Sequence, residues 1–117
     1  MSALHSDLMA IGVDIVPTLQ RFDDNEVLLV RCLKLFARDD SASAASDALE
    51  AGNFRQLESI AHSVKGTSVN VGLADLSARW DAVLQAVREE RFEDVDGLTR
   101  SALEEFHATQ QAINALP

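Results

Sequence analysis

Apolar residues recur along most of the chain at the three- and four-residue spacing of an amphipathic helix. The clearest stripe lies between residues 73 and 87 and consists of Leu73, Leu76, Trp80, Val83, Leu84 and Val87. A second stripe begins near Glu93 and consists of Val95, Leu98, Ala102, Phe106 and Ile113. No segment shows the sustained alternation of apolar and polar residues that is typical of strands. The pattern therefore predicts an all-α fold.

Capping residues and glycines set the expected ends of the earlier helices. Residues 2–10 can form one short helix, and a second can run from an Asp14 cap to Phe22 with Pro17 in its first turn. The acidic start at residues 23–26 favours a long third helix to Ala51, bent near Asp40. Its expected apolar stripe is Leu29, Leu33, Phe36, Ala44, Ala48 and Ala51.

Two glycines bound the next helix, which we expect from about residue 54 to residue 71. Gly52 and Gly72 stand where helix-ending glycines stand, and Asn53 with Gln56 resembles a capping box. Four amphipathic helices with short connections predict an antiparallel up-and-down four-helix bundle over residues 24–116. One or two short N-terminal helices in residues 1–22 complete a single domain of residues 1–117.

His62 lies away from the apolar face of the helix predicted over residues 54–71. The apolar face of that helix is formed by Leu57, Ile60, Ala61, Val64, Ser68 and Val71. At 100° per residue His62 points roughly 140° away from Leu57, so it should be exposed. Lys65 and Gly66 are its neighbours one turn later. A mid-helix glycine costs about 1 kcal/mol relative to alanine, and it would let another molecule approach the imidazole closely.

Composition and charge narrow the choice of partners. The chain has 10 Lys and Arg against 19 Asp and Glu, a net charge of −9, which opposes binding to nucleic acid or to an anionic membrane. Residues 52–72 reverse this sign, because Arg55 and Lys65 outweigh Glu58 there. A single cysteine excludes an intramolecular disulfide and suits the cytoplasm. No apolar run reaches the roughly 20 residues of a membrane span, and we expect no signal peptide.

The chemistry of His62 leaves several interpretations open. An exposed neutral imidazole is a competent nucleophile near pH 7, and Lys65 could offset the charge of a phosphoryl group bound there. A surface histidine can equally have no role, and a lone glycine can serve close helix packing. A metal-binding bundle is disfavoured because His5, His62 and His107 lack ligand spacing. A hydrolase is disfavoured because a convex helix face makes a poor substrate cleft.

Residues 61–72 resemble the signature of histidine-containing phosphotransfer (HPt) domains. In that signature a phosphorylated histidine precedes lysine and glycine by three and four positions, and asparagine and glycine commonly follow. All five positions are filled here, by His62, Lys65, Gly66, Asn70 and Gly72. The likeness covers roughly residues 12–114 and is diffuse outside the signature. The glycine often found before the family's last helix is missing from residues 87–92.

The resemblance implies a cytoplasmic phosphocarrier of two-component phosphorelays, with His62 as the phosphoacceptor. Lys65 and Gly66 would stabilise the phosphoryl group and admit the partner, and the receiver interface would include Arg55, Glu58, Val69 and Asn70. The partners would be a response-regulator receiver domain or a hybrid sensor histidine kinase. The receiver would supply magnesium, while this chain would hold no cofactor or metal, bind no ATP and have no autokinase activity. The alternative is a helical module that docks on a receiver or kinase without carrying phosphate.

Overall fold

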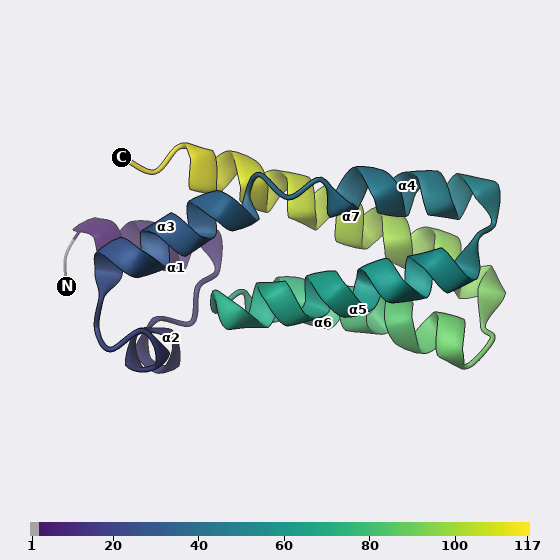
Figure 1. Cartoon of the computed structure of the whole chain (residues 1–117), viewed down its shortest axis with the longest axis horizontal. Helices are drawn as coiled ribbons and strands as arrows, with labels where there is room; N and C mark the ends of the chain where they lie inside the picture. Colours follow the sequence, from purple (N-terminus) through teal and green to yellow (C-terminus); the bar gives the residue numbers. More distant parts are fainter. Residues whose placement is uncertain (1–2) are drawn as a thin grey trace.

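The fold is all-α over residues 3–117, which are the residues that the computed structural model describes (Figure 1). This confirms that the fold is all-α, as predicted. The expected start of the first helix at residue 2 lies outside the described range. Seven helices follow one another: α1 (Ala3–Ile11), α2 (Ile15–Arg21), α3 (Glu26–Phe36), α4 (Ser41–Ala51), α5 (Phe54–Asn70), α6 (Ala74–Arg88) and α7 (Phe92–Asn114).

The prediction of one long helix from residue 24 to Ala51 is wrong, because α3 ends at Phe36 and α4 begins at Ser41. Asp39 accepts hydrogen bonds from both the backbone N–H and the hydroxyl of Ser41, at 2.9 and 2.7 Å. Such local side-chain bonds compete with helix propagation. Gln110 of α7 fixes the interruption from outside by donating to the carbonyl of Ala37 at 3.0 Å.

The interruption also changes which alanines of α4 face the core. α3 buries Leu29, Leu33 and Phe36 as predicted. The new helix starts in a different rotational phase, so α4 buries Ala42, Ala45 and Ala48, whereas the expected Ala51 is exposed and Ala44 only half-buried. An alanine-rich segment has small residues on several faces, so its spacing alone does not fix its orientation.

Helices α4 to α7 pack on one another and reverse direction from one to the next (Figure 1). α5 contacts α4 on one side and α6 on the other, and α7 closes the set by contacting both α4 and α6. The molecule is elongated, with extents of 44 × 23 × 18 Å. No helix of the described range is long and apolar enough to cross a bilayer. Because α4 and α6 pack on its two sides, α5 keeps an outer face that its neighbours leave uncovered.

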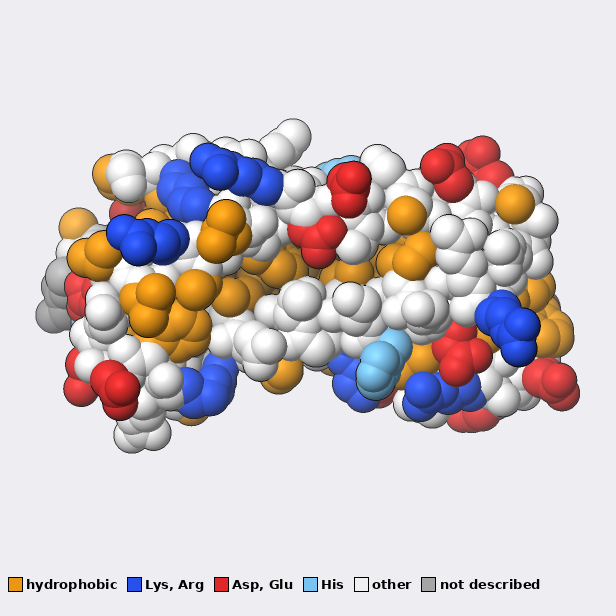
Figure 2. All heavy atoms as spheres, in the orientation of Figure 1, with side chains coloured by type: hydrophobic (Ala, Val, Ile, Leu, Met, Phe, Trp, Pro, Cys, Tyr) orange, Lys and Arg blue, Asp and Glu red, His pale blue; other side chains and the backbone are white. Residues whose placement is uncertain are grey.

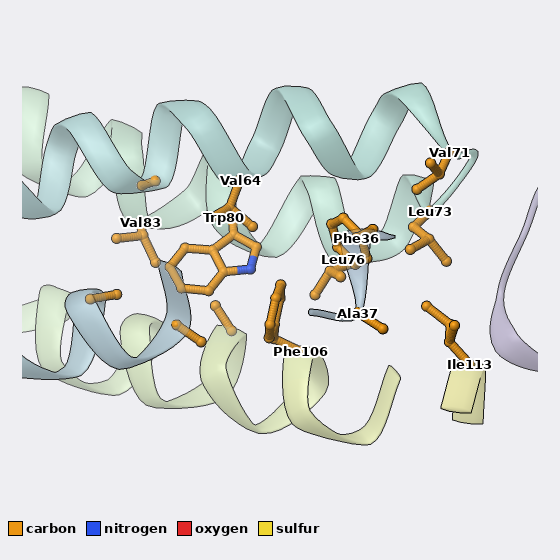
Figure 3. Packing of buried hydrophobic residues seen from close by; sticks show 14 of the residues in the cluster. Phe36, Ala37, Val64, Val71, Leu73, Leu76, Trp80, Val83, Phe106 and Ile113 are labelled. Carbon is orange, nitrogen blue, oxygen red and sulfur yellow. The ribbon is translucent and has the colours of Figure 1, made fainter. Parts of the chain in front are cut away.

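Aromatic residues anchor the core between α3, α6 and α7 (Figure 3). Trp80 and Phe106 are fully buried, with ring centroids 6.4 Å apart and planes at 89°, and Phe36 lies 5.3 Å from Phe106. The indole Nε1 of Trp80 has no hydrogen-bond partner in the described chain, but it points toward the Phe106 ring. An N–H facing an aromatic ring recovers part of the lost hydrogen-bond energy.

The N-terminal helices attach to the end of α5. Gly72 follows α5 with a φ of 81°, and its carbonyl accepts the backbone N–H of Asp14 at 2.9 Å. Val13 forms an isolated antiparallel bridge with Leu73, and Arg21 donates to the carbonyl of Val69 at 2.9 Å. These contacts hold α2 against the C-terminal end of α5.

Candidate functional site

α5 carries the candidate site, and its N-terminus is capped as the sequence suggested. Gly52 adopts the left-handed conformation at φ 68°, and the Asn53 side chain accepts the backbone N–H of Gln56 at 3.1 Å. The second bond of a capping box is different here, because the Asn53 side chain, not its backbone, donates to Gln56 Oε1 at 3.2 Å. The Asn53 backbone N–H instead satisfies the carbonyl of Ala48 at the end of α4. The turn between α4 and α5 is therefore closely fixed.

His62 is the central residue of the 17 in α5 and is exposed, as predicted. The opposite face of the helix is buried and consists of Leu57, Ala61, Val64 and Ser68. Neither ring nitrogen of His62 has a hydrogen-bond partner among residues 3–117. Both nitrogens are therefore available to a molecule that approaches from solvent.

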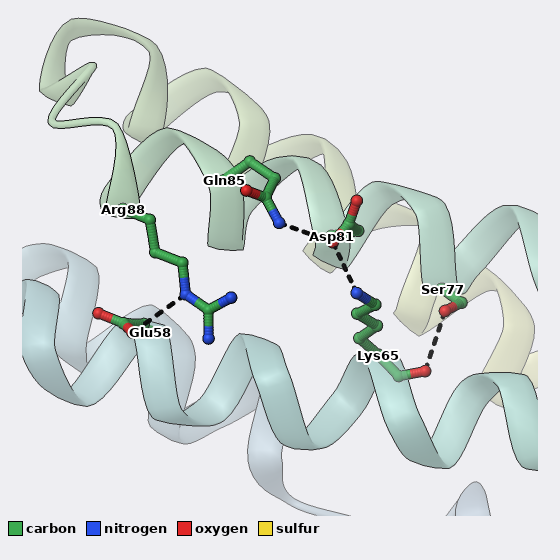
Figure 4. Close-up of polar contacts among 6 residues, drawn as sticks. All are labelled: Glu58, Lys65, Ser77, Asp81, Gln85 and Arg88. Atoms are coloured by element: carbon green, nitrogen blue, oxygen red, sulfur yellow. Dashed lines mark hydrogen bonds and ion pairs between the residues drawn. The ribbon is translucent and has the colours of Figure 1, made fainter.

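Lys65, the cation expected to offset the charge of a phosphoryl group on His62, is paired with a carboxylate in the structure. Its ammonium group donates to Asp81 Oδ1 of α6 at 2.8 Å, and Gln85 Nε2 donates to the same oxygen at 3.2 Å (Figure 4). The hydrogen bond from Lys65, followed by that from Gln85, lowers the pKa of the Asp81 carboxyl below its ordinary value. Lys65 thus lies beside the His62 face but is already paired with a carboxylate.

Gly66 lies on the exposed face, one turn after His62. Apart from its chain neighbours and the nearby backbone of α5, a Cβ atom placed on Gly66 would meet no atom within 4 Å. Close helix packing therefore does not explain this glycine. The space above it is open to a partner.

Beside His62 the surface forms a shallow hollow between α5 and the end of α6, lined by Arg55, Glu58, Ser59, His62 and Arg88. Arg88 Nε lies 3.3 Å from Glu58 Oε1 (Figure 4). Arg55 is exposed and has no hydrogen bond or ion pair within the described chain. Figure 2 shows a histidine on this face with basic side chains on both sides and an acidic group close by.

Val69 and Asn70, the other two expected interface residues, lie two turns beyond His62 at the end of α5. Val69 is 49% exposed, and Asn70 borders an apolar hollow between α3 and α5 that Phe22 and Leu35 also line. Eight residues of helix place Asn70 about 12 Å from His62 along the axis. The structure therefore brings Arg55 and Glu58 to His62, but not Val69 or Asn70.

No family model, curated protein or solved structure matches this chain. Its function is therefore inferred from the geometry of this site and from the signature residues.

The sequence marks Arg88 as a surface residue that could touch a partner, but not as a site residue. In the structure Arg88 lines the hollow from the last turn of α6. Its place beside His62 depends on how α6 is rotated against α5. The one available signal was the position of Arg88 directly after the apolar stripe of α6. That position indicates that Arg88 lies on the surface, but it does not indicate on which face. Within residues 3–117 no three His, Cys, Asp or Glu side chains are grouped so that they could hold a metal ion.

Proposed function

We propose that this chain is a histidine phosphotransfer protein, in which His62 exchanges a phosphoryl group with the aspartate of a response-regulator receiver domain. In this proposal α4 to α7 form the antiparallel four-helix bundle of the HPt family. The observation that carries the proposal is the exposed, unpartnered imidazole of His62 beside the open surface over Gly66. A second protein can approach an uncovered helix face of this kind. A small substrate, in contrast, binds in a cleft, which a convex helix face does not form.

The reaction is an in-line displacement at phosphorus. Nε2 of neutral His62 attacks the phosphorus of the aspartyl phosphate, the P–O bond to the carboxyl group breaks, and the aspartate leaves as a carboxylate. The phosphoimidazolium formed then loses its Nδ1 proton to water. Catalysis in phosphoryl transfer is mainly positioning and charge stabilisation, and the receiver would supply its magnesium. Lys65 can contribute a positive charge only by exchanging Asp81 for the phosphoryl oxygens.

The chain acts as a phosphocarrier in this proposal, and a hybrid sensor histidine kinase is the alternative donor. The competing function is a helical module that docks on a receiver or kinase without carrying phosphate. The two functions differ in their need for His62. A docking module would work without the imidazole, whereas the carrier would not.

Incubation with a receiver domain phosphorylated with ³²P tests the proposal. We expect acid-labile, base-stable label on the wild-type chain, and none on His62→Gln. The matched control is His107→Gln, because His107 is also exposed on a helix but lies on α7, where it contacts Gln110. Label that persists on His62→Gln, or that disappears only from His107→Gln, contradicts the assignment.

A further inference from the structure

Two arginines share the hollow with His62 on a strongly acidic protein. Arg55 and Arg88 face one carboxylate there, that of Glu58, so the hollow carries a net charge of +1 on a chain of −9. Arg55, Ser59 and His62 follow one another at helical spacing along α5, while Arg88 reaches over from α6. Guanidinium groups and a hydroxyl beside an imidazole are the donors that a phosphoryl group accepts best.

The ion pair that holds Arg88 is the looser of the two next to His62. The 3.3 Å contact between Arg88 and Glu58 is longer than a typical charge-assisted hydrogen bond of about 2.7–2.9 Å. Their side chains are 47% and 39% exposed, and pairs of this kind contribute little to stability. Lys65 is more firmly held, because its 2.8 Å bond to Asp81 is supported by Gln85. Arg88 is therefore the cation that a new anion on His62 can draw away more easily.

We propose that Arg88 and Arg55 bind the phosphoryl group carried by His62, and that Glu58 forms an ion pair with Arg88 while His62 is unmodified. This inference rests on the proposed phosphoacceptor role of His62. Phosphorylation would replace one partner of Arg88 by another, so that the guanidinium leaves the Glu58 carboxylate for the phosphoryl oxygens. The Ser59 hydroxyl can donate a further hydrogen bond to the same group. Glu58 acts as a competing internal anion, and its removal should favour phosphoryl binding.

Chemical phosphorylation by phosphoramidate tests this subsite without a receiver. The imidazole nitrogen attacks phosphorus, the P–N bond of the reagent breaks, ammonia leaves, and the imidazolium proton passes to water. Mass spectrometry resolves the initial rate at each histidine, and His107 serves as the internal reference. Arg79→Gln is the matched control for Arg88→Gln, because nine residues of α6 place Arg79 about 180° away, where it bonds Ser101 of α7.

We expect Arg88→Gln to slow phosphorylation of His62 about 3- to 10-fold relative to Arg79→Gln, with no change at His107. Glu58→Gln should accelerate it about twofold, and that gain should shrink in the Glu58→Gln, Arg88→Gln double variant if Glu58 acts through Arg88. In the wild type the ¹⁵N signal of Arg88 Nε should shift when His62 is phosphorylated. The urea midpoints of Arg88→Gln and Arg79→Gln should equal that of the wild type, since both arginines are exposed.

Equal rates in Arg88→Gln and Arg79→Gln, or no reaction at His62 with the reagent, overturn the subsite. A Glu58→Gln gain that is fully retained in the double variant overturns the exchange between Glu58 and the phosphoryl group. Failure of the subsite leaves receiver-dependent labelling of His62 intact. Failure of the proposed function instead abolishes that labelling, whatever the phosphoramidate rates are.

Discussion

Substitution of Gly72 by alanine should destabilise the protein more than substitution of any other glycine that ends a helix. A Cβ atom at Gly72 would lie 2.2 Å from Thr18 Oγ1 and 3.1 Å from both Thr18 Cβ and Cγ2. Thr18 is fully buried in α2, so it has little room to move. The φ of 81° at Gly72 adds strain for any residue with a side chain.

The expected cost has two parts. The left-handed backbone costs an alanine about 1–2 kcal/mol, and overpacking a filled site costs about 1–3 kcal/mol. Gly72→Ala should therefore lower the free energy of unfolding by about 2–5 kcal/mol. With a urea dependence of about 1–2 kcal/mol/M, the midpoint should fall by roughly 2 M.

Alanine substitutions at two other glycines help to distinguish the backbone cost from the overpacking cost. Gly52 has a φ of 68° but nothing within 4 Å of an added Cβ, so Gly52→Ala should show the backbone cost alone. Gly97 lies inside α7 with open space around it, and Gly97→Ala should raise stability by about 0.5–1 kcal/mol. Adding Thr18→Ala to Gly72→Ala removes the nearest contacting atom and should recover about 1–2 kcal/mol. The reasoning is refuted if Gly72→Ala costs no more than Gly52→Ala, or if Thr18→Ala gives no recovery.

Two further predictions concern the surroundings of His62. Because ionised Asp81 has a lowered pKa, its stabilisation is complete above the unfolded value near 3.8 and is lost as pH falls through the folded value. Asp81→Asn should therefore lower stability by at most about 1 kcal/mol at pH 7 and by less than that at pH 3, and equal urea-midpoint differences at both pH values would contradict this. Gly66→Gln should raise the urea midpoint slightly, since the new side chain meets open space and glycine is a poor helix former. The same variant should slow transfer from a phosphorylated receiver about 10-fold by blocking its approach, and an unchanged transfer rate would show that partners do not approach over Gly66.

The parts of the fold that the sequence predicted depend on local chemistry. The ends of α5 follow from Gly52, Asn53 and Gly72, whose effects act within a few residues. The burial of Trp80 and Phe106 follows from apolar spacing on long helices. The break between α3 and α4 was predicted only as a bend near Asp40, because the local Asp39–Ser41 hydrogen bonds are supported by Gln110 of α7 across a separation of 73 residues.

The same distinction between local and long-range determinants applies to the candidate site. The exposure of His62 and Gly66 could be read from the rotation of a single helix. The partners of Lys65 and Arg88 could not, because they depend on the rotation and axial position of α6 against α5. Helical periodicity determines which way a side chain points from its own axis, but it does not determine which charges a neighbouring helix places beside it.

The contacts at the two ends of α5 give the N-terminal helices a structural role in the site. His62 has eight helical residues on either side of it, and its helix is held by the α4–α5 turn at one end and by α2 at the other. In the proposed function His62 must meet a phosphorus atom on another protein, and it would benefit from such a rigid position, because small displacements weaken in-line attack. Loosening at Gly72 would first affect the last turn of α5, about two turns from His62. The attachment of α2 therefore stabilises the helix that carries the imidazole without contributing any atom to the chemistry.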